Sequence, residues 1–215
     1  MTWVKICGTT NLDDALLAVD AGADAIGFVL GTSMRRVTPE TVAAIVRNLP
    51  PQIEKIGVFL NETPDRVVEI VKQTGLTGVQ LHGNETPSVA HQVASQTSAK
   101  IVKGIHAGPA LLDDLTLWTR ESTVSSLLLD SGNGKSGGGT GKTFDWDVAA
   151  DALKGLSSGK HVIVAGGLRA SNVTSAIDRF NPWGVDVASG VESEPGKKDP
   201  QKVKAFVAAV RNTQR

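Results

Sequence analysis

The chain has 215 residues, of which 40% are hydrophobic and 20% charged, and its 22 basic side chains balance its 22 acidic ones. This composition is typical of a folded globular protein and argues against a disordered chain. The balanced charge argues against binding to nucleic acid or to an anionic membrane surface through bulk charge, so an anionic ligand needs a local site. The length suits one domain covering residues 1–215, because single barrels commonly run to roughly 200–250 residues.

The cysteine content and the N-terminus indicate a cytoplasmic protein. One cysteine excludes an internal disulfide, and the N-terminus has no basic flank followed by an apolar stretch of the signal-peptide type. No window approaches the roughly 18 consecutive apolar residues of a membrane span. The four histidines are scattered without closely spaced cysteine, histidine or carboxylate partners, so we expect no bound metal.

Short β-branched runs alternate along the chain with longer segments of helical periodicity. The first helical segment is predicted to begin after Asn11 as its N-cap and to stop at Gly22. Two later helices are predicted to follow the caps Thr38 and Thr63, each with a proline at the first helical position. The eight predicted strands span residues 3–7, 24–30, 54–60, 78–82, 100–105, 125–130, 161–166 and 184–189.

Eight alternating strand and helix units in this length predict a parallel sheet closed into a single-domain (β/α)8 TIM barrel of the α/β class. A doubly wound open sheet is the alternative. It would normally show a glycine-rich turn after its first strand, where this chain has only "CGTT". In a barrel, functional residues come from the C-terminal strand ends and the loops that follow, and the polar residues of this chain concentrate there.

Lys5 and Cys7 lie on the same face of the first strand, because side chains alternate along a strand. Their side-chain ends can therefore be neighbours. An adjacent ammonium favours the thiolate, which is the basic and nucleophilic form of a cysteine. This pattern predicts Cys7 as a base or nucleophile. The alternative is a buried structural cysteine, since free cysteine is among the most buried residue types.

Asp130 ends the sixth strand, directly after the apolar run "SSLLL". Partial desolvation at such a position favours the protonated carboxyl, which can then act as an acid near neutral pH. The alternative is a helix cap or a loop anchor. One base and one acid at the same rim predict proton transfer, which is the chemistry of an isomerase.

The segment "SGNGKSGGGTGKTFDW", residues 131–146, is similar to a P-loop, whose pattern is G-x-x-x-x-G-K-[ST]. The first glycine of that pattern falls on Ser136, so the pattern fails by one residue. The segment also follows a late strand instead of opening a mononucleotide-binding fold. A loop that closes over the barrel mouth suits its glycines better.

A phosphate site is predicted after the seventh and eighth strands, where barrels commonly bind phosphate. Both strands end in glycines, within "AGGL" and "ASGVE", and these expose backbone N–H groups shortly before a helix start. The alternative for each is an ordinary turn.

Further polar residues belong to the same rim. Arg35 or Arg36, after the second strand, offers a guanidinium for a substrate carboxylate. Gln80 and His82 share one face of the fourth strand, and Asp186 lies on the eighth. Taken alone, each of these residues is more common as a structural group than as a functional one.

The motifs "KICGTTNLDDA", "SMRRVTPE", "VQLHG", "LLLDS", "AGGLRASNV" and "VDVASGVESEPGKKD" together resemble the phosphoribosylanthranilate isomerase family of tryptophan biosynthesis. The resemblance runs in order from Lys5 to the region of Asp199. The resemblance implies a (β/α)8 fold and a cofactor-free Amadori rearrangement of N-(5-phosphoribosyl)anthranilate to 1-(2-carboxyphenylamino)-1-deoxyribulose 5-phosphate. Asp130 would protonate the furanose ring oxygen and help to form a Schiff base, and Cys7 would then remove the proton from C2.

The same resemblance implies how the substrate is bound. Arg35 would face the anthranilate carboxylate, and Asp186 and His82 would line the substrate, with Gln80 beside His82. The backbone that holds the phosphate would be that of Gly166, Gly167, Ser189 and Gly190.

Two other functions remain open at this point. One is another barrel enzyme acting on a phosphorylated sugar, such as an epimerase, and the other is a non-catalytic barrel that binds a phosphorylated ligand. Each of these functions involves a small phosphorylated molecule, without nucleic acid and without a membrane. A monomer and a homodimer are both compatible with the sequence.

Overall fold

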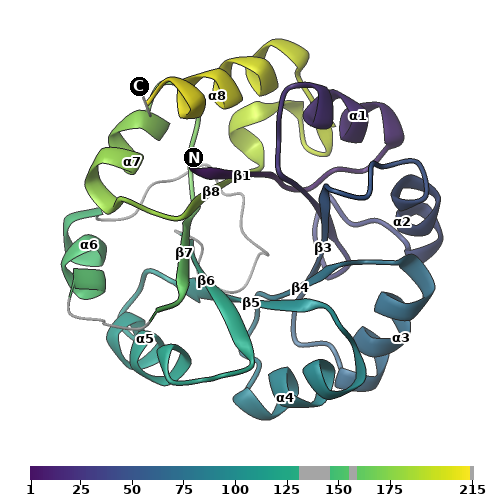
Figure 1. Cartoon of the computed structure of the whole chain (residues 1–215), viewed down its shortest axis with the longest axis vertical. Coiled ribbons are helices and arrows are strands. Elements are labelled where there is room, and N and C mark those ends of the chain that lie inside the picture. The colour runs from purple at the N-terminus through teal and green to yellow at the C-terminus, as the bar shows by residue number, and fades with distance from the viewer. Residues whose placement is uncertain (131–145, 155–158, 214–215) are drawn as a thin grey trace.

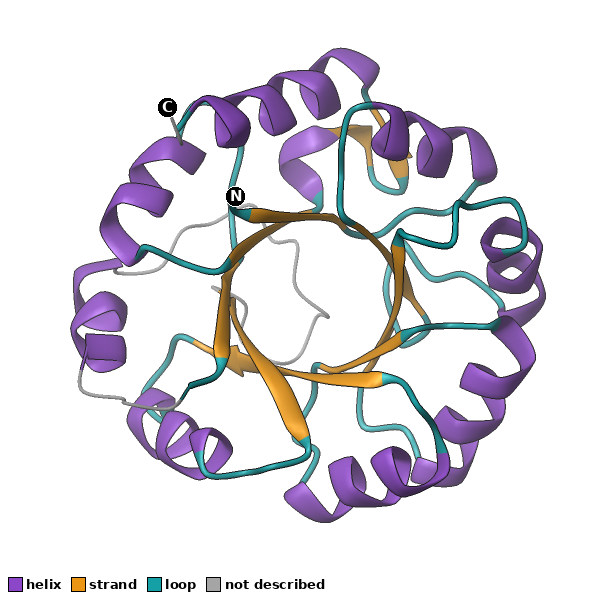
Figure 2. Cartoon of the chain, viewed as in Figure 1, coloured by secondary structure: helices purple, strands orange, loops and turns teal. Residues whose placement is uncertain are grey.

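The computed structural model describes residues 1–130, 146–154 and 159–213, which form a closed barrel of eight parallel strands with helices around it (Figures 1 and 2). The strands are β1 Trp3–Ile6, β2 Ala25–Val29, β3 Glu54–Phe59, β4 Gly78–Leu81, β5 Lys100–His106, β6 Val124–Asp130, β7 His161–Val164 and β8 Gly184–Val187. The predicted (β/α)8 barrel is confirmed. The alternative of an open doubly wound sheet is wrong, because β1 pairs with β8 as well as with β2.

The helices lie outside the strands, one after each (Figure 2). They are α1 Leu12–Asp20, α2 Pro39–Val46, α3 Pro64–Thr74, α4 Pro87–Gln96, α5 Leu111–Thr119, α6 Trp146–Lys154, α7 Val173–Phe180 and α8 Pro200–Asn212. Between β8 and α8 the chain adds a short 3-10 turn, η1 Ser189–Val191, and an antiparallel hairpin of β9 Glu192–Glu194 and β10 Lys197–Lys198.

Helices α1, α2 and α3 begin directly after the predicted N-cap residues Asn11, Thr38 and Thr63. The Asn11 side chain accepts a hydrogen bond from the Asp14 N–H at 2.8 Å, and Thr38 accepts one from the N–H of Thr41 at 3.2 Å. Thr63 occupies the N-cap position of α3, but its side chain forms no capping bond. Gly22 follows α1 with φ of +93°, a conformation that glycine adopts readily, as expected for a residue that ends a helix.

The barrel interior changes from apolar to polar along its axis. One end is lined by an apolar cluster of Trp3, Ala25, Ile56, Val102, Leu128 and Ile163, which reaches the cavity at the other end through Ala165. Toward the C-terminal strand ends, buried polar groups sit beside a small cluster of Cys7, Val29 and Val58. Side chains from several strands thus fill the barrel in layers, and the polar layer lies at the end where barrel enzymes carry their chemistry.

Two inward-facing glycines make room for these polar side chains. A Cβ at Gly27 would lie 2.7 Å from Cys7 Sγ and 2.9 Å from Lys5 Cε. A Cβ at Gly104 would collide with the imidazole of His82. A glycine inside a strand often marks such a close approach, and here both approaches involve residues of the predicted site.

The glycine-rich segment 131–145, with its P-loop-like pattern and its predicted loop over the barrel mouth, lies outside the described residues. Among the residues that the structure describes, every helix is too short or too polar to cross a membrane.

Candidate active site

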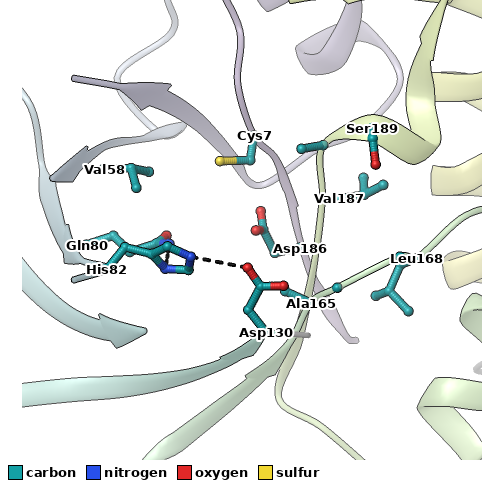
Figure 3. A pocket seen from close by; sticks show the side chains of 13 residues that line it. Cys7, Val58, Gln80, His82, Asp130, Ala165, Leu168, Asp186, Val187 and Ser189 are labelled. Atoms are coloured by element: carbon teal, nitrogen blue, oxygen red, sulfur yellow. Dashed lines mark hydrogen bonds and ion pairs between the residues drawn. The ribbon is translucent and has the colours of Figure 1, made fainter. Parts of the chain in front are cut away.

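A cavity at the C-terminal end of the barrel brings most of the predicted site residues together (Figure 3). Their positions follow from the fold, because the C-terminal ends of all eight parallel strands meet at one rim. The lining residues are Cys7, Val58, Gln80, His82, Asp130, Ala165, Gly166, Gly167, Leu168, Asp186, Val187, Ala188 and Ser189. Arg35 and Gly190 are not among them.

Lys5 is fully buried and crosses the junction between the first and last strands. Its neighbour across the β1–β8 ladder is Asp186, and their side chains form an ion pair with 3.0 Å between Lys5 Nζ and Asp186 Oδ1. The ammonium also donates to Gln80 Oε1 at 2.8 Å. Burial acts to lower the pKa of Lys5, but the charges of Asp186 and Cys7 overcome it, so the pKa is raised and the ammonium persists.

From Gln80 the polar contacts continue across the cavity to β6. Gln80 Nε2 lies 2.9 Å from His82 Nδ1, and His82 Nε2 lies 3.2 Å from Asp130 Oδ2. All three side chains are buried. Figure 3 shows His82 bonded to Asp130 on one side of the cavity, with the Cys7 thiol opposite and Asp186 between them.

The environment of Cys7 differs from the expectation based on Lys5 alone. Burial, the largest influence, raises the pKa of the Cys7 thiol above its usual value, and the charge of Asp186 raises it further. Lys5 and Lys198 act in the opposite direction but do not outweigh burial. Lys5 thus lowers the pKa of Cys7, in the direction predicted, but burial at the strand end penalises the charged sulfur more.

The two glycine-rich strand ends face each other at the cavity. Gly166 and Gly167 have φ of +83° and +67°, and η1 begins at Ser189 on the other side. Among the described residues, the N–H groups of Gly166, Gly167 and Ser189 have no hydrogen-bond acceptor within the protein. Gly190 lies behind them, where a Cβ would collide with the Leu168 carbonyl.

Arg35 lies beside the cavity and is held by a buried carboxylate. Its Nε and Nη2 donate to both oxygens of Glu192 at 2.6–3.0 Å, which leaves Nη1 outside this ion pair. Lys198 binds the same carboxylate at 2.9 Å and also donates to the Cys7 carbonyl at 2.6 Å. Arg36, in contrast, is exposed.

Comparison with known proteins identifies the family. The model of the N-(5'-phosphoribosyl)anthranilate isomerase family matches residues 4–209. The chain belongs to this isomerase family. The resemblance drawn from the sequence motifs is therefore confirmed, and the chain is an enzyme, a phosphoribosylanthranilate isomerase of tryptophan biosynthesis.

Relatives of known sequence and structure agree over their full lengths. The N-(5'-phosphoribosyl)anthranilate isomerase of Pelobacter propionicus is 45% identical over 99% of this chain and 97% of its own length. A solved phosphoribosylanthranilate isomerase containing reduced 1-(o-carboxyphenylamino)-1-deoxyribulose 5-phosphate is 36% identical, with a TM-score of 0.84 over 99% of this chain and all of its own. Monomers generated from the dimeric isomerase of Thermotoga maritima match with the same identity, TM-score and coverage.

The Arg35–Glu192–Lys198 network of this isomerase was not predicted from the residues alone. Glu192 and Lys198 stand in the motif "SGVESEPGKKD", which contributed to the resemblance to the isomerase family but carries no periodicity that would indicate burial. The sequence does contain one signal. Arg35, Glu192 and Lys198 all belong to motifs near the predicted site, and because buried charges in proteins are generally paired, their opposite charges could have suggested a buried ion-pair network.

Replacing Glu192 by glutamine is expected to destabilise this isomerase by about 3 kcal/mol at neutral pH, because Arg35 and Lys198 are then buried without a counter-charge. Burial acts to raise the pKa of Glu192, but its bonds to Arg35 and Lys198 hold it below the usual value. Its contribution to stability is thus present above the ordinary carboxyl range and lost as the pH falls through the lowered pKa. Urea unfolding at a series of pH values measures both effects.

The matched control for this variant is Glu194→Gln on the same hairpin, where the carboxylate is 66% exposed and pairs with an exposed lysine. This change is expected to alter the free energy of unfolding by less than about 0.5 kcal/mol. Equal stability of the two variants at neutral pH would contradict a structural role for the Glu192 ion pairs.

Proposed function

We propose that Asp130 is the general acid and Cys7 the general base of the Amadori rearrangement of N-(5-phosphoribosyl)anthranilate. The observation that carries this assignment is the convergence of the two groups on one cavity, from β6 and β1, beside the glycine-rich ends of β7 and β8. A proton donor, a proton acceptor and anion-binding N–H groups are the parts that the reaction requires.

In the first step Asp130 gives its proton to the furanose ring oxygen. The bond between that oxygen and C1 breaks while the lone pair of the anthranilate nitrogen forms the C1=N bond of a Schiff base. Cys7, as the thiolate, then takes the proton from C2. The electrons of that C–H bond form the C1=C2 bond while the π electrons of the C1=N bond return to the nitrogen, which gives an enolamine. Tautomerisation gives the ketone at C2, so the reaction moves protons without net oxidation and needs no redox cofactor.

Substrate binding follows from the two ends of the site. We assign the phosphate to the backbone of Gly166, Gly167 and Ser189, which line the cavity and whose N–H groups have no acceptor among the described residues, and to that of Gly190, which directly follows Ser189. Arg35 is favoured over Arg36 for the anthranilate carboxylate. Arg35 is buried near Cys7, whereas Arg36 is exposed. Glu192 orients the guanidinium of Arg35 and leaves its Nη1 available for a substrate carboxylate.

The test is a direct assay of the purified chain with N-(5-phosphoribosyl)anthranilate, followed by the loss of substrate fluorescence, beside ribulose 5-phosphate as a pentulose control. We expect turnover of the first compound and none of the second. Turnover of the pentulose phosphate alone would instead indicate an epimerase or another phosphosugar isomerase. If both phosphorylated compounds raise the melting temperature of the protein but neither is turned over, the chain would be a non-catalytic binding barrel.

A further inference from the structure

The buried contacts from Lys5 to Asp130 form one continuous series of hydrogen bonds across the barrel. Lys5 on β1 bonds to Gln80 on β4, Gln80 bonds to His82 two residues further along the same strand, and His82 bonds to Asp130 on β6. Gln80 is only 2% exposed, and both ends of its amide are engaged in this series. Its polar atoms are thus directed at protein groups.

The chemistry of Lys5 sets the direction of every bond in the series. An ammonium has no lone pair and can only donate, so the atom of Gln80 that faces it must be the carbonyl oxygen. The amide NH2 then faces His82 Nδ1 and donates to it. A reversed amide would bring its own N–H groups against the donors of Lys5 at 2.8 Å, with no acceptor between them.

The donor from Gln80 leaves one protonation form for His82. Because Nδ1 accepts a hydrogen bond, it carries no proton, and the proton of the neutral ring resides on Nε2. That Nε2–H points at Asp130 Oδ2. A doubly protonated ring is excluded by the same contact, since its Nδ1–H would meet the NH2 of Gln80.

The packing around His82 holds the ring in this orientation. Gly104 backs directly onto the imidazole, where a Cβ would collide with Nδ1. The ring of His106 stands edge-on to it, with 5.4 Å between centroids. Burial lowers the pKa of His106, so this neighbour is neutral at neutral pH and adds no charge that competes with Gln80.

We propose that Gln80 is a positioning residue, which holds His82 as the Nε2–H tautomer so that His82 orients the carboxyl of Asp130 for proton delivery. The proposal rests on the role of Asp130 as general acid proposed above. Lys5 lies beside Cys7 and fixes Gln80, so one ammonium influences the base directly and the acid through two intervening side chains.

The tautomer can be measured by two-bond 1H–15N correlation spectra of the enzyme labelled with 15N-histidine. The chain has four histidines, and replacing the exposed His91 and His161 by glutamine leaves only His82 and His106 to assign. We expect His82 to show an unprotonated Nδ1 and a protonated Nε2. A His82 protonated on Nδ1, alone or together with Nε2, would overturn the proposal.

Gln80→Glu provides the decisive variant, because a carboxylate still accepts from Lys5 but has no proton to donate to His82. Nδ1 of His82 must then carry a proton, and the spectrum is expected to change accordingly. We expect kcat to fall by about 100-fold, the lower range of a general-acid contribution, with KM little changed. Gln92→Glu, on the exposed face of α4, makes the same chemical change and is expected to alter neither readout.

If the new buried charge prevents folding, Gln80→Met keeps the side-chain length without any donor or acceptor. Its His82 is expected to lose the single tautomer and kcat is expected to fall, whereas an unchanged tautomer and kcat would overturn the proposal. Failure of the acid assignment would appear as full turnover by Asp130→Asn. Failure of the present proposal alone would appear as an inactive Asp130→Asn beside a fully active Gln80 variant.

Discussion

Cys7→Ser is expected to fold as the same barrel but to lose isomerase turnover by about 10²–10⁴-fold, the range that a general base contributes. A serine hydroxyl fits the space of the thiol, so the cavity is retained. It does not ionise in the accessible pH range, however, so the proton on C2 has no acceptor at this position. Measurement of kcat and kcat/KM by loss of substrate fluorescence, with circular dichroism as a check on the fold, decides the point.

The pH dependence gives the same variant a second readout. Burial raises the pKa of the Cys7 thiol, so the thiolate fraction of the free enzyme is small near neutrality and grows as the pH rises. The kcat/KM of the unchanged enzyme is therefore expected to increase toward alkaline pH, and this rise is expected to vanish in Cys7→Ser. Ala18→Ser buries a comparable hydroxyl on α1 outside the cavity and serves as the control. Near-full turnover by Cys7→Ser would refute the base assignment.

Asp130→Asn is expected to reduce kcat by a similar factor of about 10²–10⁴, because an amide cannot supply the proton that opens the furanose ring. The amide keeps the size of the carboxyl, and its oxygen can still accept the hydrogen bond from His82 Nε2. Binding of the phosphate and the anthranilate ring is left in place. We therefore expect kcat to fall far more than KM rises, as steady-state kinetics will show.

Asp113→Asn, in the exposed first turn of α5, is the matched control and is expected to retain full activity. An Asp130→Asn enzyme with unchanged kcat would show that the ring-opening proton comes from another group. A rise in KM alone would show that Asp130 acts in substrate binding and not in proton transfer.

Most of the barrel was predictable because its signals are local. The described strands lie within two residues of the predicted ends, and the caps at Asn11 and Thr38 form as expected. Strand alternation placed Lys5 and Cys7 on one inward face, and the common rim of parallel strands brought Asp130 to them.

What the sequence did not provide are the contacts between strands far apart in the chain. Alternation places Gln80 and His82 on one face but does not tell which end of the amide meets Lys5, since that depends on the register around the closed barrel. The net shift in the pKa of Cys7 could not be predicted from the sequence either. Burial raises this pKa and Lys5 lowers it, and only the packed structure shows which effect is larger. The partner of Arg35 lies 157 residues away, beyond any local pattern.

The charges around the site depend on the pairing of β1 with β8, which can form only after most of the chain has been synthesised. Lys5 and Asp186 are separated by 181 residues, so their contact is among the last that a ribosome-bound chain can form. Before β8 pairs with β1, the ammonium of Lys5 beside Cys7 lacks its partner carboxylate, Asp186. The barrel is also still open, so the position of Gln80 relative to Lys5 is not yet fixed. The pairing of β1 with β8 therefore does two things at once: it completes the ion pair between Lys5 and Asp186, and it removes the two open edges of the sheet.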